Sequence, residues 1–124
     1  MIGYVDAIEK ITEKNKNFRT VLFTCKYCQL VVMSLLPGEE IGMEVHPTVD
    51  QFFRIEKGKG KVVMNGEEAA FGPGFAIIVP AGTQHNVIAT TAVKLYTIYS
   101  PPNHPANRVQ KTKAEAVAEE ESHA

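Results

Sequence analysis

The chain has 124 residues, of which 13 are basic and 14 acidic, and its formal net charge is −1. This length suits one globular domain, and the average apolar and charged fractions exclude a disordered or fibrous chain. A nearly neutral charge gives no electrostatic footprint for nucleic acid, and no stretch reaches the length of a membrane span. We therefore expect neither nucleic acid nor a membrane as a partner.

The N-terminal region carries charges early, at Asp6, Glu9 and Lys10. They interrupt any apolar run before the core of a signal peptide could form, so we expect a cytoplasmic protein. Residues 4–11 fit either a strand or a turn of helix.

Short runs rich in β-branched and aromatic residues follow, separated by turn signals. Repeated short strands of this kind, about 8–12 residues apart, indicate an all-β sandwich or barrel of antiparallel strands. Asn65-Gly66 is a strong hairpin signal within the series. The expected strands cover residues 18–24, 29–36, 41–46, 51–56, 61–64, a short run ending at 71, 75–79, 85–91 and 93–100.

The two cysteines, Cys25 and Cys28, stand between the first two expected strands. A CxxC pair can be a redox site or half of a zinc site. No second Cys/His pair with the spacing of a zinc knuckle exists, and a thioredoxin-like pair should begin a helix. A tight hairpin turn over Lys26-Tyr27 is the favoured interpretation.

The character of the chain changes after Ser100. The segment Pro101–Pro105 cannot continue a central strand, because proline lacks the N–H donor, and we expect it to lie extended over the barrel. Thr112 and Glu115 fit a helix capping box, so residues 111–124 are expected to form a tail with a short or frayed helix after one barrel domain of residues 1–110. His104 and His123 carry no motif and are expected at the surface.

The segment 38–58 places polar side chains at one end of an apolar face. Glu44 and His46 are two residues apart, so on a strand they share a face. Gln51 begins the next strand and shares its face with Phe53, which we expect in the cavity wall. His85 follows the Pro80-Ala81-Gly82 turn and can face the same cavity as His46.

These two segments resemble the paired motifs of the cupin superfamily. Gly38, His46 and Gly58 match the first motif, and Gly74, Pro80, Gly82 and His85 match the second. The resemblance implies a cupin-type antiparallel β-barrel, or jelly roll, with a metal near one mouth. The final asparagine of the second motif is replaced by Ala89, although Asn86 directly follows the histidine.

Two of the metal-ligand positions that the cupin resemblance implies carry different residues in this chain. Glu44 stands where the first histidine is expected, and Gln51 stands where the glutamate is expected. The carboxylate has moved rather than disappeared, so the ligand set keeps a formal charge of minus one. The implied metal ligands are Glu44, His46 and His85, with Gln51 as a weaker fourth ligand or a hydrogen-bonding neighbour.

Two histidines and one carboxylate suit non-haem Fe(II) with open coordination positions. Iron or manganese ranks first for this divalent transition metal, and nickel or zinc next. A small-molecule metalloenzyme with dioxygenase-like chemistry is the leading interpretation.

Two alternatives stay open, because a fold shared so widely does not fix a function. A metal-assisted isomerase or lyase is one, but an isomerase of sugar phosphates needs a cation. Arg54 and Lys94 are the candidates, and strand parity from Gln51 turns Arg54 away. The other alternative is a non-catalytic barrel that binds a small ligand. Phe52 should face outward, and an exposed aromatic often marks an oligomer surface. The resemblance to cupins of this size likewise implies a homodimer.

Overall fold

The structure is a computed structural model and describes residues 1–122, so His123 lies outside the described part. Within residues 1–122 the chain forms two helices and nine strands. In chain order they are α1 (Ile8–Lys14), β1 (Arg19–Thr24), β2 (Gln29–Leu35), β3 (Asp50–Lys57), β4 (Gly60–Met64), β5 (Glu67–Phe71), β6 (Ala76–Val79), β7 (His85–Ala89), β8 (Val93–Ser100), β9 (Val109–Gln110) and α2 (Lys113–Ser122).

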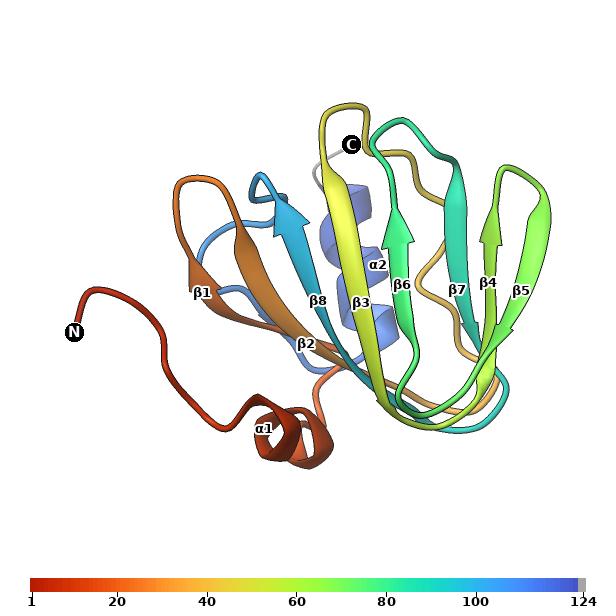
Figure 1. The fold of residues 1–124 in the computed structure, drawn as a ribbon, viewed down its shortest axis with the longest axis horizontal. Helices are drawn as coiled ribbons and strands as arrows, with labels where there is room; N and C mark the ends of the chain where they lie inside the picture. Colours follow the sequence, from red (N-terminus) through yellow and green to blue (C-terminus); the bar gives the residue numbers. More distant parts are fainter. Residues whose placement is uncertain (123–124) are drawn as a thin grey trace.

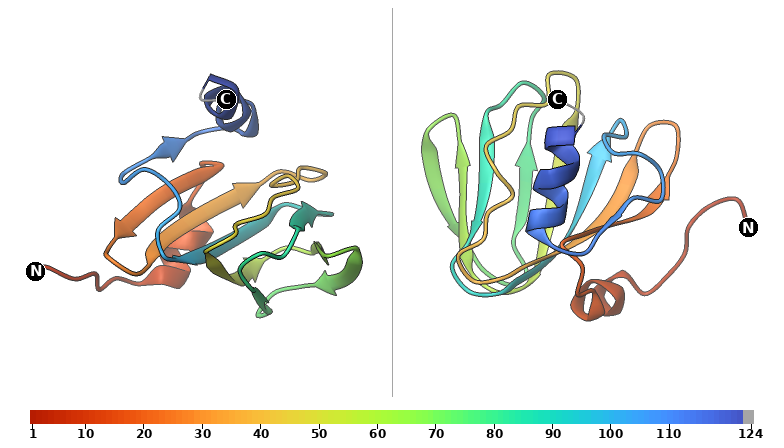
Figure 2. Two further views of the ribbon diagram at one scale, coloured as in Figure 1. Left: turned by 90° about the horizontal axis from the view of Figure 1, so that it is seen from above. Right: turned by 180° about the vertical axis from the view of Figure 1, so that it is seen from behind.

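The strands make two antiparallel sheets that face each other as a jelly roll. The larger has the order β6-β3-β8-β2-β1-β9, and the smaller has the order β5-β4-β7 (Figure 1). From behind, α2 and the chain that joins β2 to β3 lie across the same side of the larger sheet (Figure 2). The all-β fold class and the short C-terminal helix expected from the sequence are both confirmed. Neither described helix has the length and apolar character needed to cross a membrane.

The inner face of the larger sheet is organised in rows of cross-strand neighbours. One row, near one mouth of the barrel, is polar apart from Val79 and contains Gln29, Tyr99 and Gln51. A second row contains Met33, Leu95 and Ile55, all fully buried. The alternation of strand side chains thus builds an apolar core at one end of the barrel interior and a buried polar region, which we call the chamber, at the other.

Two hairpin predictions are confirmed by the backbone. Asn65 and Gly66 join β4 to β5, and both have positive φ, as a two-residue type I′ turn requires. The Cys25 N–H donates to the Cys28 carbonyl at 3.0 Å, which closes the tight turn between β1 and β2.

Gly58, the last residue of the first motif segment, has a steric role. Its φ is 95°, and an added Cβ would lie 2.0 Å from the Ala92 carbonyl oxygen. No other residue fits this close approach between the end of β3 and the start of β8.

One local expectation is wrong, and two others gain detail. Residues 41–46 are not a strand: this stretch makes a single isolated bridge, Glu44 with His85, and Gly42, at φ 113°, interrupts the extended chain. The ambiguous N-terminal region contains a helix, α1. Before α2, the Thr112 hydroxyl accepts a hydrogen bond from the Glu115 N–H at 3.1 Å, which is the N-cap half of the expected box.

Candidate metal centre

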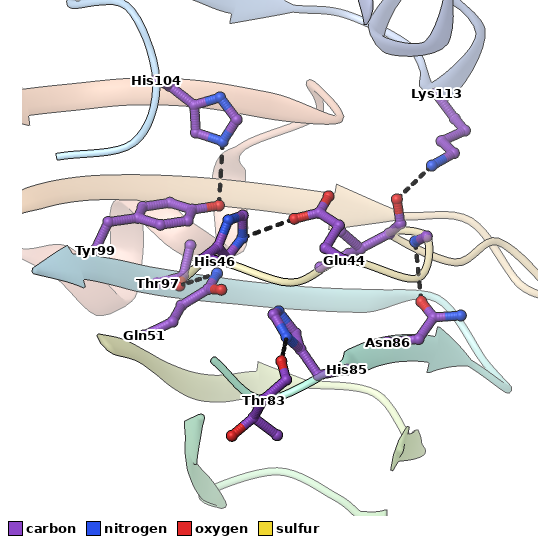
Figure 3. A network of polar contacts seen from close by, with 12 residues as sticks. Glu44, His46, Gln51, Thr83, His85, Asn86, Thr97, Tyr99, His104 and Lys113 are labelled. Carbon is purple, nitrogen blue, oxygen red and sulfur yellow. Dashed lines mark hydrogen bonds and ion pairs between the residues drawn. The ribbon is translucent and has the colours of Figure 1, made fainter. Parts of the chain in front are cut away.

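The two motif segments are joined by backbone hydrogen bonds at the mouth of the barrel. Glu44 and His85 exchange N–H···O bonds of 2.8 and 2.9 Å, and the Gly82 N–H donates to the His46 carbonyl at 2.9 Å. Gly82 has φ of +81°, which the tight turn before His85 requires. The backbone therefore fixes Glu44, His46 and His85 side by side before any ligand is bound (Figure 3).

The side chains of these three residues converge on one point. A ligand atom from each lies within 4.8 Å of the others, a geometry that can hold a metal ion. His46 Nε2 lies 2.8 Å from Glu44 Oε2, so the two side chains pair directly with each other (Figure 3). A divalent ion at this point would take the place of the shared proton, with both atoms as ligands.

His85 is oriented by a second contact. Its Nδ1 lies 2.9 Å from the Thr83 carbonyl oxygen. A carbonyl can only accept, so Nδ1 carries the proton and Nε2 is left with its lone pair free. Metal-binding histidines are commonly fixed in this way by a hydrogen bond from the other ring nitrogen.

Glu44 is held as a carboxylate. Burial raises its pKa, but the contacts with His46 and the nearby charges of Arg19 and His85 outweigh burial, and the net pKa is lower than usual. The anionic form required for metal binding is therefore the form present at neutral pH.

Gln51 faces the chamber, as its parity predicts. Its side chain is buried, and its Nε2 donates to the Thr97 hydroxyl at 3.0 Å. Its Oε1 is buried and has no hydrogen-bond partner within the described chain. Phe53, predicted to line the cavity, is likewise buried and lies one row deeper.

The expectation that His104 is a surface residue is wrong. His104 is half-buried, and its Nε2 lies 3.2 Å from the Tyr99 hydroxyl. Gln29 anchors the segment: its Oε1 accepts from the His104 N–H at 2.9 Å, and its Nε2 donates to the His104 carbonyl. Sequence spacing gives no sign of this contact, because Gln29 and His104 are 75 residues apart.

Burial sets the protonation of this pair. Burial and the nearby charge of Arg19 lower the pKa of His104 to about 3, so its ring is neutral at neutral pH. Burial raises the pKa of Tyr99 to about 12, although the nearby Arg19 and Gln51 oppose the rise. The Tyr99 ring also meets the His46 ring edge-on, with 6.1 Å between their centres.

Arg19 is the functional candidate that the sequence interpretation missed. It is 6% exposed and lies on β1 with the same parity as the buried Val21. Applying strand alternation to β1 would have placed it inside. The two cations proposed from the sequence lie elsewhere: Arg54 pairs with Glu56 at 3.1 Å, and Lys94 donates to the Asn15 carbonyl.

Two further sequence features have structural roles. Asn86 accepts a hydrogen bond from the Gly42 N–H at 2.9 Å and donates to Glu40 at 3.1 Å, so it braces the segment that carries Glu44. The Cys25 and Cys28 thiols are free, with their sulfurs 3.2 Å apart. The hydrogen bond with Cys25 raises the Cys28 pKa, whereas an activated thiol needs a lowered one.

Comparison with known proteins agrees with the fold and the motif positions. The Cupin domain family matches residues 31–99, which cover both motif segments. The chain belongs to this family.

The relatives found share most of the chain but carry no assigned activity. The uncharacterized protein YrkC of Bacillus subtilis is 50% identical, over 95% of this chain and 68% of its own. The uncharacterized protein L612 of Acanthamoeba polyphaga mimivirus is 42% identical, over 86% of this chain and 70% of its own. The crystal structure of BH2720 from Bacillus halodurans superposes with a TM-score of 0.90 at 44% identity, covering 93% of each chain.

Proposed function

We propose that this protein is a metal-binding cupin that acts on a small molecule, with dioxygenase-like chemistry the leading interpretation. The observation that carries the proposal is the convergence of ligand atoms from Glu44, His46 and His85. The close approach of His46 to Glu44, together with the fixed ring of His85, fits a bound ion.

Glu44, His46 and His85 would hold a divalent ion, and Gln51 Oε1 would face it as a weaker ligand. The buried carbonyl without a partner supports this role, because an unsatisfied buried acceptor is otherwise costly. A two-histidine, one-carboxylate set leaves coordination positions open and suits iron or manganese first, then nickel or zinc. The ion would supply Lewis-acid or redox chemistry to a substrate at those positions.

The protein's own groups give the site its shape and charge. Glu44 supplies the negative charge, His85 is held in one tautomer by Thr83, and Phe53 closes the chamber below with apolar surface. The half-buried His104 and the Tyr99 hydroxyl form a neutral polar wall beside His46. A neutral wall leaves Glu44 as the negative group that compensates the cation.

Metal analysis of protein purified without added metal tests the proposal. Wild type is expected to contain close to one transition-metal ion per chain, and His46→Ala and Glu44→Ala to lose it. His104→Asn is the matched histidine control and should retain the metal. Equal metal content in wild type, His46→Ala and Glu44→Ala would contradict the site.

Oxygen uptake distinguishes the chemical alternatives. The iron-loaded protein should consume oxygen with an enolic or phenolic substrate. Isomerisation or bond cleavage without oxygen uptake would favour the isomerase or lyase, for which the buried Arg19 now offers the cation that Arg54 and Lys94 do not. A loaded protein that binds small ligands without turnover would indicate the non-catalytic barrel.

A second copy of the chain is the partner we propose for the outer face of the larger sheet. Ile78, Phe52, Ile98 and Leu30 are cross-strand neighbours there and form an apolar row, with Ile78 64% exposed. Such a continuous row is a typical interface surface. Sedimentation should give a dimer for wild type and a monomer for Ile78→Glu; a wild-type monomer at high concentration would contradict it. The cytoplasmic location stays a prediction.

A further inference from the structure

Arg19 is a buried cation with incomplete partners. Its Nη1 donates to Gln110 Oε1 at 2.6 Å and the guanidinium also hydrogen-bonds the Tyr99 side chain, but its buried Nε has no hydrogen-bond partner within residues 1–120. No carboxylate of residues 1–120 lies at ion-pair distance from the guanidinium. A buried charge of this kind is costly unless it is paired, so the open Nε calls for an explanation.

The guanidinium lies close to the metal cluster, because it hydrogen-bonds the Tyr99 side chain, whose ring meets the His46 ring edge-on with 6.1 Å between their centres. Its charge lowers the pKa values of Glu44 and His104 and opposes the rise in that of Tyr99, so it lies near all three. These residues come from three separate segments that meet around the chamber. Arg19 therefore extends from β1 into the interior that also contains Glu44.

Tethering of the C-terminal segment explains only part of this arrangement. Gln110 on β9 accepts from Arg19 and donates to Glu119 on α2 at 2.8 Å, so Arg19 helps to fix β9. One neutral donor would satisfy the Gln110 oxygen equally well. The positive charge and the free Nε edge are not used by the tether.

We propose that Arg19 binds the carboxylate of a small organic anion that is held beside Glu44, His46 and His85. This inference rests on the proposed function, because it names the class of ligand for that site. A guanidinium edge matches the planar fork of a carboxylate. A phosphate is less suited, because the other nearby guanidinium, Arg108, is already paired with Glu119 at 3.4 Å and the site contains the Glu44 carboxylate.

Binding of simple anions to the protein tests the inference. Acetate, lactate, pyruvate and benzoate would be titrated calorimetrically into the apo and manganese-loaded wild type, Arg19→Met and Gln110→Met proteins. Lactamide is the neutral counterpart of lactate, and inorganic phosphate is the competing anion. Metal stoichiometry and a thermal melt would be measured on each sample.

At least one carboxylate should bind wild type, and Arg19→Met should weaken it roughly 10- to 100-fold, the loss expected for a charge-assisted hydrogen bond. Lactamide should bind no better to wild type than to Arg19→Met. Gln110→Met should keep the carboxylate affinity, because it breaks the tether and leaves the cation. If Arg19→Met does not fold, Arg19→Lys should bind carboxylates more weakly than wild type, since lysine cannot form the fork.

Several results would overturn the inference: binding of no carboxylate, tighter binding of phosphate, equal losses in Arg19→Met and Gln110→Met, or undiminished affinity in Arg19→Lys. The proposed function fails separately. Arg19-dependent carboxylate binding by a wild type that takes up no metal would support the anion site and contradict the metal site. If wild type instead binds one metal ion per chain and its carboxylate affinity does not depend on Arg19, the metal site is supported and the anion site is contradicted.

Discussion

Two inner rows of the larger sheet show how one strand pattern yields both a core and a site. The row of Met33, Leu95 and Ile55 is apolar and fully buried. Four residues along the same strands, the row of Gln29, Tyr99 and Gln51 is equally buried but polar, and it borders the metal cluster. Parity decides which side chains enter the barrel, and position along the strand decides what they do there.

The largest expected effect lies in the apolar row. Leu95→Ala should lower the free energy of unfolding by about 2–5 kcal/mol, because it leaves a cavity in a fully buried position. Denaturant unfolding measures this, and the protein that remains folded should bind metal as wild type does. Loss of the metal with little loss of stability would mean that the two rows are not separate in function.

A smaller effect on stability, but a complete effect on the metal, is expected for His85→Ala. An ion that binds the folded state alone stabilises it, so a chelator should lower the Tm of wild type. The variant should melt at the same temperature with and without the chelator. A chelator shift of wild-type size in His85→Ala would show that the ion binds elsewhere.

In the polar row, replacing Gln51 should weaken metal binding without lowering the stability of the metal-free protein. Gln51→Met removes a buried carbonyl that has no hydrogen-bond partner within the part of the chain described. We expect metal affinity to fall roughly 10-fold, the size of effect seen for groups that support a metal site. The metal-free variant should be as stable as wild type or more so, by up to about 1 kcal/mol. A clearly less stable apoprotein would indicate a structural role, and calorimetry with denaturant unfolding separates the two.

His104 should make the free energy of unfolding depend on pH, an effect that the residues of the apolar row cannot have. Its pKa is about 3 in the folded protein, below the ordinary value of 6.5, so the unfolded chain binds a proton that the folded chain does not. Stability should therefore fall as the pH drops below 6.5, by up to about 1.4 kcal/mol per pH unit. Denaturant unfolding of the metal-free protein at pH 7 and pH 5 should show this loss in wild type and a smaller loss in His104→Asn. Equal losses would contradict the burial of His104.

The sequence predicted the part of the site that rests on local spacing. Glu44, His46 and His85 stand at motif positions, and two-residue alternation brings Glu44 and His46 to one side although residues 41–46 are not a strand. Gln51 and Phe53 followed from parity within β3.

The rest of the site depends on long-range contacts. Arg19 is held by Gln110, 91 residues away, and His104 by Gln29 across 75 residues. Proline-rich chain such as residues 101–105 has no periodicity from which a direction could be derived. Strand parity would have turned Arg19 inward, but nothing local indicates that a buried arginine faces a metal-binding chamber.

The most direct test of the central claim is a calorimetric titration of manganese(II) into metal-free wild type, Glu44→Gln and Glu67→Gln. Glu67 is exposed on β5, so its variant removes the same charge away from the site. The account predicts one ion per chain for wild type and Glu67→Gln, and at least about a 10-fold loss of affinity in Glu44→Gln, the amount expected when a charged contact is removed. Equal affinities for Glu44→Gln and wild type would contradict it.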